Sequence, residues 1–180
     1  MSERQAPVDP AATAIQDLYP EEFAWCYGCG RRNSEGHRLK SYWDGDRTVA
    51  RFTPQPYHLA VPGFVSGGLL ASLVDCHATG TASAAADRAA GHPYGVGPLP
   101  RFVTASLRVE YLRPTPLGPE LVLYGRAVSL SERKVTVEVS LHAGETQTVR
   151  GEVLCALLPA SMAEHSAPGR AEPDPAGRRS

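Results

Sequence analysis

The sequence predicts an α+β fold in which one central, buried helix is wrapped by a curved antiparallel sheet of about six strands. Two observations lead to this prediction. In most of the chain, apolar and polar residues alternate with a period of two, which is typical of strands that bury one face. The stretch 67–89 is the exception, because small and apolar residues surround every side of a projected helix, as expected of a helix that is buried all round.

The strands are predicted by this alternation and by the turn residues between them. From Val103 to Tyr111 apolar residues occupy the odd positions and polar residues the even ones, which predicts that the odd positions face the core. Proline at 114 and 116 ends that strand. The other segments predicted as strands are HRLKSYWD (37–44) and DRTVARFTP (46–54) around a DGD turn, ELVLYGRAVSL (120–130), KVTVEVSLHA (134–143) and TQTVRGEVLCALL (146–158).

The helix carries one residue that its apolar surroundings do not explain. Ser66 is expected to cap the helix, and Gly80 in its interior lets a neighbouring segment approach closely, at a cost of about 1 kcal/mol in helix propensity. Asp75 lies in the same apolar run, where a carboxylate costs free energy unless something pairs or uses it. Asp75 is therefore a candidate functional residue.

Length and charge limit the function classes. A chain of 180 residues suggests one domain, and a net charge of -1 with 21% charged residues gives no basic excess for nucleic acid. The N-terminal sequence lacks a secretory pattern and no apolar stretch is long enough to span a membrane. Four cysteines are too few to stabilise a domain of this size by disulfides, and this number is consistent with a reducing compartment. We expect a cytoplasmic protein with no nucleic-acid or membrane partner.

Composition divides the chain into three segments. Residues 1–20 form an N-terminal segment that is partly disordered, with a short amphipathic turn or helix in TAIQDLYPEEF (13–23). Residues 21–159 form the folded domain. Residues 160–180 are rich in proline, glycine and charge, and we expect them to be disordered because they cannot bury enough apolar surface to offset the entropy of ordering.

Three motifs in this order resemble the hotdog-fold acyl-CoA thioesterases of the phenylacetic-acid type. They are CYGCGRRNSEGHRL (26–39), PGFVSGGLLASLVD (62–75) and TASLRVEYLRPTPLG (104–118). The resemblance implies a hotdog fold and hydrolysis of a thioester carried by coenzyme A or by an acyl-carrier protein.

The resemblance also implies the catalytic residues. Family members have His-Gly-Gly at the start of the helix and an acidic residue eight positions after the first glycine; Gly67 and Gly68 match the glycines and Asp75 the acid. The N–H of Gly67 then polarises the thioester carbonyl, and Asp75 is the nucleophile or the general base. Thr79 matches a polar position that helps to place the acid or the attacking water, and Thr104 is a further candidate substrate contact.

The chemistry supports these roles independently. Oxygen gains negative charge when a thioester carbonyl is attacked, and N–H groups at a helix N-terminus stabilise that charge. Apolar surroundings are expected to raise the pKa of Asp75, which makes it a better base.

Two departures from the family pattern stand near the helix start. Ser66 replaces the histidine before the glycines, and Leu59 and Ala60 stand where the family often has an amide side chain. His58 is the candidate substitute, as a hydrogen-bond partner of Asp75 across the interface or of the lytic water.

Helix geometry predicts a dimer. Eight residues at ~1.5 Å each separate Gly67 from Asp75 by roughly 12 Å, too far for both to grip one thioester. A second copy with an antiparallel helix brings Asp75 of one chain near Gly67 of the other. We expect an obligate homodimer, with a homotetramer left open.

Two other functions stay open. Ser66 and the missing amide favour a hotdog protein that binds an acyl thioester or a small hydrophobe without hydrolysing it. The third function is a metal-stabilised interaction module built on Cys26 and Cys29, but a structural zinc site needs four ligands and no second Cys/His pair follows nearby, so we expect no metal and no cofactor. Hotdog hydratases place a histidine where this chain has Gly80, which disfavours dehydration, and His77 is expected to be structural.

Overall fold

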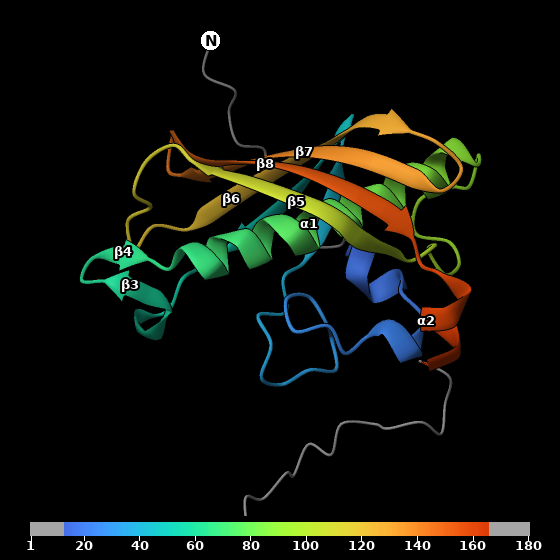
Figure 1. Cartoon of the computed structure of the whole chain (residues 1–180), viewed down its shortest axis with the longest axis horizontal. Coiled ribbons are helices and arrows are strands. Elements are labelled where there is room, and N and C mark those ends of the chain that lie inside the picture. Colours follow the sequence, from blue (N-terminus) through green and yellow to red (C-terminus); the bar gives the residue numbers. More distant parts are fainter. Residues whose placement is uncertain (1–12, 166–180) are drawn as a thin grey trace, which may run out of the picture.

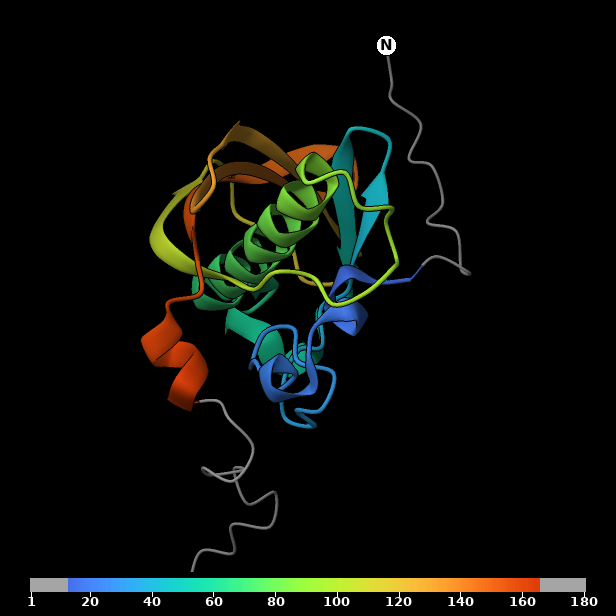
Figure 2. The same cartoon turned by 90° about the vertical axis from the view of Figure 1, so that its right-hand side faces the viewer.

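The structure, a computed structural model, describes residues 13–165 and confirms the predicted α+β fold: an antiparallel sheet curves around one long helix (Figures 1 and 2). The elements are η1 (Ile15–Leu18), η2 (Glu21–Phe23), β1 (Ser41–Asp44), β2 (Arg47–Phe52), η3 (Pro56–His58), β3 (Leu59–Val61), β4 (Phe64–Val65), α1 (Gly67–Ala89), β5 (Phe102–Tyr111), β6 (Leu121–Leu130), β7 (Lys134–Ala143), β8 (Thr146–Leu157) and α2 (Ala160–His165). Six strands form the main sheet in the order β1-β2-β6-β7-β8-β5, and β3 pairs with β4 in a small second sheet.

Helix α1 has the predicted bounds and forms the centre of the core. The side chains of Leu73 and Val74 on this helix are fully buried in the core. Gly151 in β8 allows this close packing, because a Cβ there would lie 2.3 Å from Cγ1 of Val74. Residues 13–40 cover the helix face that points away from the sheet (Figures 1 and 2). Gly80 contacts η1 on that face, and a Cβ on Gly80 would be 3.0 Å from Nε2 of Gln16.

The strands follow the predicted segments, but the predicted buried face of β5 is wrong for the single chain. Burial alternates along β7 as expected. In β5, Phe102 is buried, whereas Ala105, Leu107 and Tyr111 are exposed. The physical reason is position: β5 is one of the two edge strands, bonded to β8 on one side only among the described residues, and its register with β8 shifts near Ala105.

At its start the folded part has short helical structure where a turn or helix was expected, and at its end it has a helix where disorder was expected. The segment 13–23 forms two short 3-10 helices, η1 and η2. Residues 160–165, expected to be disordered, form helix α2. The remaining residues for which disorder was expected, 1–12 and 166–180, lie outside the described residues. No described helix combines the length and apolar character needed to cross a membrane.

Candidate active site

The start of α1 presents backbone donors to a hollow. Ser66 is the N-cap residue, but its hydroxyl forms no capping hydrogen bond, so the predicted side-chain cap is wrong. Among the described residues the structure gives the N–H groups of Gly67 and Gly68 no partner. Gly68 is exposed and Gly67 half-buried. These are the unpaired donors that every helix N-terminus has, and they are available to an incoming oxygen.

Tyr111 positions the first turn of the helix. Its hydroxyl donates to the carbonyl oxygen of Gly67 at 2.8 Å, which ties the end of β5 to the start of α1. A Cβ on Gly67 would lie 3.3 Å from that hydroxyl, so glycine suits this contact. The sequence analysis missed this role, because Tyr111 fits the alternation of the strand and was predicted to be a core residue.

A mostly apolar hollow of about 510 Å³ lies beside this turn. Asp75 does not line it, which agrees with the separation estimated along the helix. Arg113 brings an exposed cation to its wall. The lining residues are Val61, Phe64, Val65, Gly67, Leu70, Tyr111, Leu112, Arg113, Pro114 and Thr115.

Asp75 extends from the middle of α1 toward the edge strand. The side chain is half-buried, and the hydroxyl of Thr104 in β5 donates to its Oδ1. Burial raises the pKa of Asp75, while the hydrogen bond from Thr104 and the charge of Arg101 oppose that rise. Among the described residues Asp75 forms no salt bridge. The structure therefore brings together two predicted site residues, Asp75 and Thr104, at the open edge of the sheet.

Thr79 and His77 lie elsewhere on the helix. The hydroxyl of Thr79 is buried and donates to the carbonyl oxygen of Cys76 at 3.2 Å, so Thr104 rather than Thr79 holds the carboxylate in this chain. His77 is fully buried, with Nδ1 2.9 Å from Oγ of Ser41 and Nε2 3.3 Å from Oγ1 of Thr48. Those contacts fit the structural role expected for His77.

His58 lines a different hollow, of about 630 Å³, together with His37. Its Nδ1 accepts a hydrogen bond from the N–H of Gln55 at 3.0 Å, and its ring centre lies 5.4 Å from that of His37. Burial lowers the pKa of His58, so the neutral ring is favoured. The described contacts do not join His58 to Asp75.

Comparison with known proteins gives one family. The family model of the thioesterase superfamily matches residues 62–150. Acyl-coenzyme A thioesterase THEM4 of Xenopus laevis is 30% identical over 106 residues, which are 59% of this chain and 42% of that protein. THEM4 of Bos taurus is 28% identical over 109 residues, 61% of this chain and 39% of that protein. The chain thus spans less than half the length of these curated relatives.

Solved structures agree with the family match. A thioesterase superfamily protein from Shewanella loihica PV-4 has 49% identity and a TM-score of 0.58, and the match covers 71% of this chain and 96% of that one. PaaI from the phenylacetic acid degradation operon of E. coli matches with a TM-score of 0.55 at 13% identity, over 68% of this chain and 81% of PaaI. The likeness to PaaI shows a shared fold.

Proposed function

Because the chain belongs to the thioesterase superfamily and has its hotdog fold, we propose that it hydrolyses an acyl-CoA thioester to a carboxylic acid and a free thiol. The matched residues 62–150 contain Gly67, Asp75 and Thr104. The observation that carries the proposal is the state of Asp75: a half-buried carboxylate, held by one threonine hydroxyl and not consumed by a salt bridge among the described residues. A carboxylate kept in that state is suited to act as a base or nucleophile.

The proposed site is shared by two copies of the chain. Strand β5 is an edge with unpaired backbone groups, and an edge of this kind is a template for pairing with another chain. Leu107 and Tyr111 on this strand are 39% and 53% exposed, which is apolar surface that a second copy would cover. Pairing of β5 with β5 across a twofold axis places Asp75 at the interface. A homodimer is the minimum assembly of this proposal.

The reaction then uses one group from each copy. Ionised Asp75 takes a proton from water as the water oxygen attacks the thioester carbon, or it attacks that carbon itself and is released by water. The N–H of Gly67 of the partner subunit donates to the carbonyl oxygen as it becomes negative. The C–S bond breaks, the sulfur leaves as a thiolate and takes up a proton, and the acid is released.

Coenzyme A is the proposed carrier. The hollow beside Gly67 is mostly apolar, as an acyl or pantetheine chain requires, and Arg113 supplies a cation that suits a phosphate group. An acyl-carrier protein offers the same pantetheine arm without the nucleotide. Comparing acyl-CoA with the matching acyl-pantetheine separates the two carriers, because only acyl-CoA gains from nucleotide contacts.

The test is thiol release from a panel of acyl-CoAs by the wild-type protein and by Asp75→Asn. We expect kcat to fall at least about 100-fold in the variant, because an amide neither removes a proton nor attacks carbon. Asp87→Asn is the matched control: Asp87 is on the same helix, is buried, and contacts Nδ1 of His92 at 2.7 Å, away from the proposed site. Normal turnover by Asp75→Asn contradicts the mechanism.

A second candidate function is binding without hydrolysis. It is favoured by Ser66 in place of the family's histidine and by the absence of a capping hydrogen bond from its hydroxyl. The same experiment distinguishes it, since a wild-type protein that binds acyl-CoA in calorimetry but releases no thiol from any member of the panel is a binding protein.

A further inference from the structure

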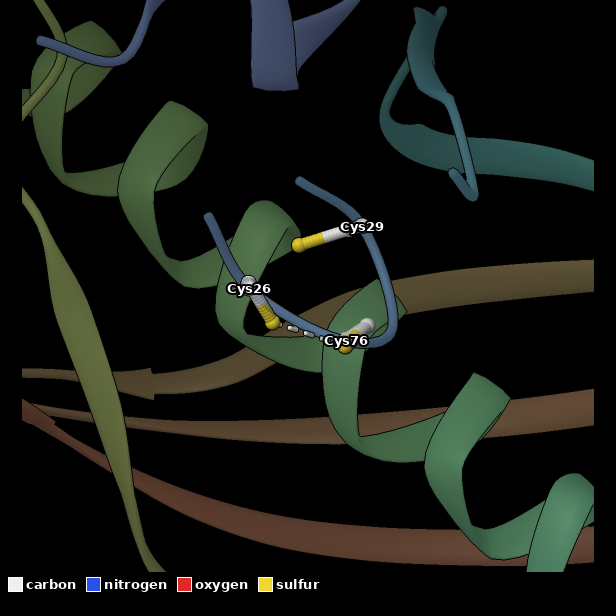
Figure 3. A group of neighbouring side chains, drawn as sticks. All are labelled: Cys26, Cys29 and Cys76. Carbon is white, nitrogen blue, oxygen red and sulfur yellow. Dashed lines mark hydrogen bonds between the residues drawn. The ribbon is translucent and has the colours of Figure 1, made fainter. Parts of the chain in front are cut away.

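Three cysteines from two distant parts of the sequence meet beside α1. Cys26 and Cys29 lie on the loop before β1, and Cys76 lies on the helix and faces that loop (Figure 3). Their three sulfur atoms are within 4.8 Å of one another, and Sγ of Cys26 is 3.7 Å from Sγ of Cys76. All three are free thiols. The sequence analysis found only the first two, because Cys76 is separated from them by nearly fifty residues and fits the buried pattern of the helix.

The loop is shaped to bring its sulfurs to the helix. A Cβ on Gly28 would lie 2.2 Å from Sγ of Cys76, so only glycine allows the loop to lie this close. A Cβ on Gly30 would lie 2.5 Å from the N–H nitrogen of Cys26, and the N–H of Gly30 donates to the carbonyl oxygen of Cys26 at 2.7 Å. The N–H groups of Gly28 and Cys29 turn inward to the sulfur of Cys26. The loop is therefore a tight turn in which the thiols of Cys26 and Cys29 both point toward Cys76.

The three thiols interact with one another. Hydrogen bonds from the neighbouring thiols and amides lower the pKa of Cys26, so its thiolate is stabilised. The pKa of Cys29 and of Cys76 is raised, chiefly because these thiols share hydrogen bonds with the sulfur of Cys26, and further because they are buried and lie close to other sulfurs. Geometry favours a metal ion here: three sulfurs within 4.8 Å of one another can all contact one ion, and an ion that binds a thiol displaces its proton.

Arg101 balances the charge of such a site. Its positive charge acts on Cys29, and its Nη1 is buried with no hydrogen-bond partner among the described residues. Three thiolates and a divalent ion sum to a charge of -1, which the guanidinium of Arg101 compensates. The guanidinium already lies over the ring of Tyr19, with Cζ 4.6 Å from the ring centre, and a negatively charged metal cluster adds a second favourable neighbour.

We propose that Cys26, Cys29 and Cys76 bind a soft, thiolate-preferring divalent metal ion, with zinc as the probe. Two sulfurs at about 2.3 Å from a tetrahedral zinc are about 3.8 Å apart, and the sulfurs of Cys26 and Cys76 already have that separation. Three protein ligands leave one of zinc's positions to water or another non-protein ligand. The ion ties the loop to the helix turn that carries Asp75, and the proposal does not depend on the hydrolase activity.

The experiment titrates the reduced, full-length protein with zinc against a chromophoric chelator, and with cobalt in place of zinc to record its absorption spectrum. We expect one ion per chain, thiolate-to-cobalt charge-transfer bands, the strong visible bands of tetrahedral cobalt, and a higher melting temperature with zinc. Cys76→Ala should weaken zinc binding at least about 100-fold, since even the loss of an outer contact commonly costs 10- to 100-fold.

Two further variants keep the test decisive. Cys155→Ala is the matched control, because Cys155 is a buried cysteine outside the cluster. The zinc affinity of this variant should equal that of the wild type. Gly28→Ala keeps all three thiols but pushes the loop from Cys76, and it should weaken binding while the circular dichroism stays native. Zinc affinity that is unchanged in both Cys76→Ala and Gly28→Ala shows adventitious binding and overturns the proposal. A disulfide within the cluster would also overturn it. In that case protein purified without reductant has a mass two hydrogens lower, and the same protein binds no zinc after reduction.

Discussion

Asp75 and His77 are two residues apart on α1, and their different burial gives these two polar side chains different roles. Asp75 is half-buried at the open sheet edge and keeps a carboxylate with one hydroxyl partner. His77 is fully buried and spans Ser41 and Thr48. The oxygen of Thr48 in turn lies 2.5 Å from that of Thr81. Because its neighbours are hydroxyls rather than charges, His77 fits its site only as the neutral ring.

His77 should make the stability of the fold depend on pH. Burial lowers the pKa of His77 from 6.5 to about 3. A group whose pKa is lower in the folded state stabilises the fold above its unfolded pKa, and this contribution is lost as pH falls from about 6.5 toward 3. One such group makes the free energy of unfolding about 2 kcal/mol smaller at pH 5 than at pH 7. Urea unfolding at both pH values, in metal-free buffer with chelator, measures the difference.

His77→Gln is the control for that measurement. Glutamine keeps a hydrogen-bonding group but does not titrate, so the variant should lose about 2 kcal/mol less between pH 7 and pH 5 than the wild type, whatever its absolute stability. An identical pH slope in the two proteins would show that His77 is not the group responsible.

At the scale of elements, the packing of α1 on the sheet depends on where side chains are missing. Gly151 in β8 faces Val74, and Gly125 in β6 faces the group of hydroxyls around His77, where a Cβ would lie 2.5 Å from Oγ1 of Thr81. Side chains of the helix therefore pack directly against the backbone of β8 and β6 at these two glycines. A larger residue at either position separates the two layers.

Gly151→Ala tests that packing. The added methyl overlaps Cγ1 of Val74, a fully buried and rotationally stiff side chain, and we expect the free energy of unfolding to fall by about 1–3 kcal/mol. Chemical denaturation measures the loss. In the double variant with Val74→Ala the overlap is gone, so the combined loss should be smaller than the sum of the single losses. Additive losses would place the cause elsewhere.

For the whole molecule, the open side of β5 is the feature that the single chain leaves unexplained. Its exposed apolar residues adjoin the hollow at the helix start, whose wall includes Val61 and Phe64, themselves 57% and 41% exposed. Contiguous exposed apolar surface is typical of places where another chain or a ligand binds. The proposed dimer covers this surface and completes the site in the same step.

Leu107→Lys tests the dimer. Two lysines brought together near the middle of a β5–β5 pair repel each other, and we expect sedimentation to show monomers and thiol release to fall at least about 10-fold. Val128→Lys is the matched control, since Val128 is an exposed apolar residue on β6, separated from β5 by β7 and β8. Full turnover by a monomeric Leu107→Lys protein contradicts a shared site.

The sequence by itself determined the elements of this protein: the bounds of α1, the six strands of the sheet, and Asp75 as an unusual residue in an apolar helix. These depend on periodicity and local composition, which neighbouring residues carry. Only the tertiary structure decided that β5 is an edge with an exposed face, that Thr104 rather than Thr79 holds Asp75, that Tyr111 bonds Gly67, and that Cys76 joins Cys26 and Cys29. The physical reason is distance along the chain. The last three findings depend on contacts between residues 29 to 50 positions apart, and the edge position of β5 depends on its pairing with β8, so no local pattern encodes them.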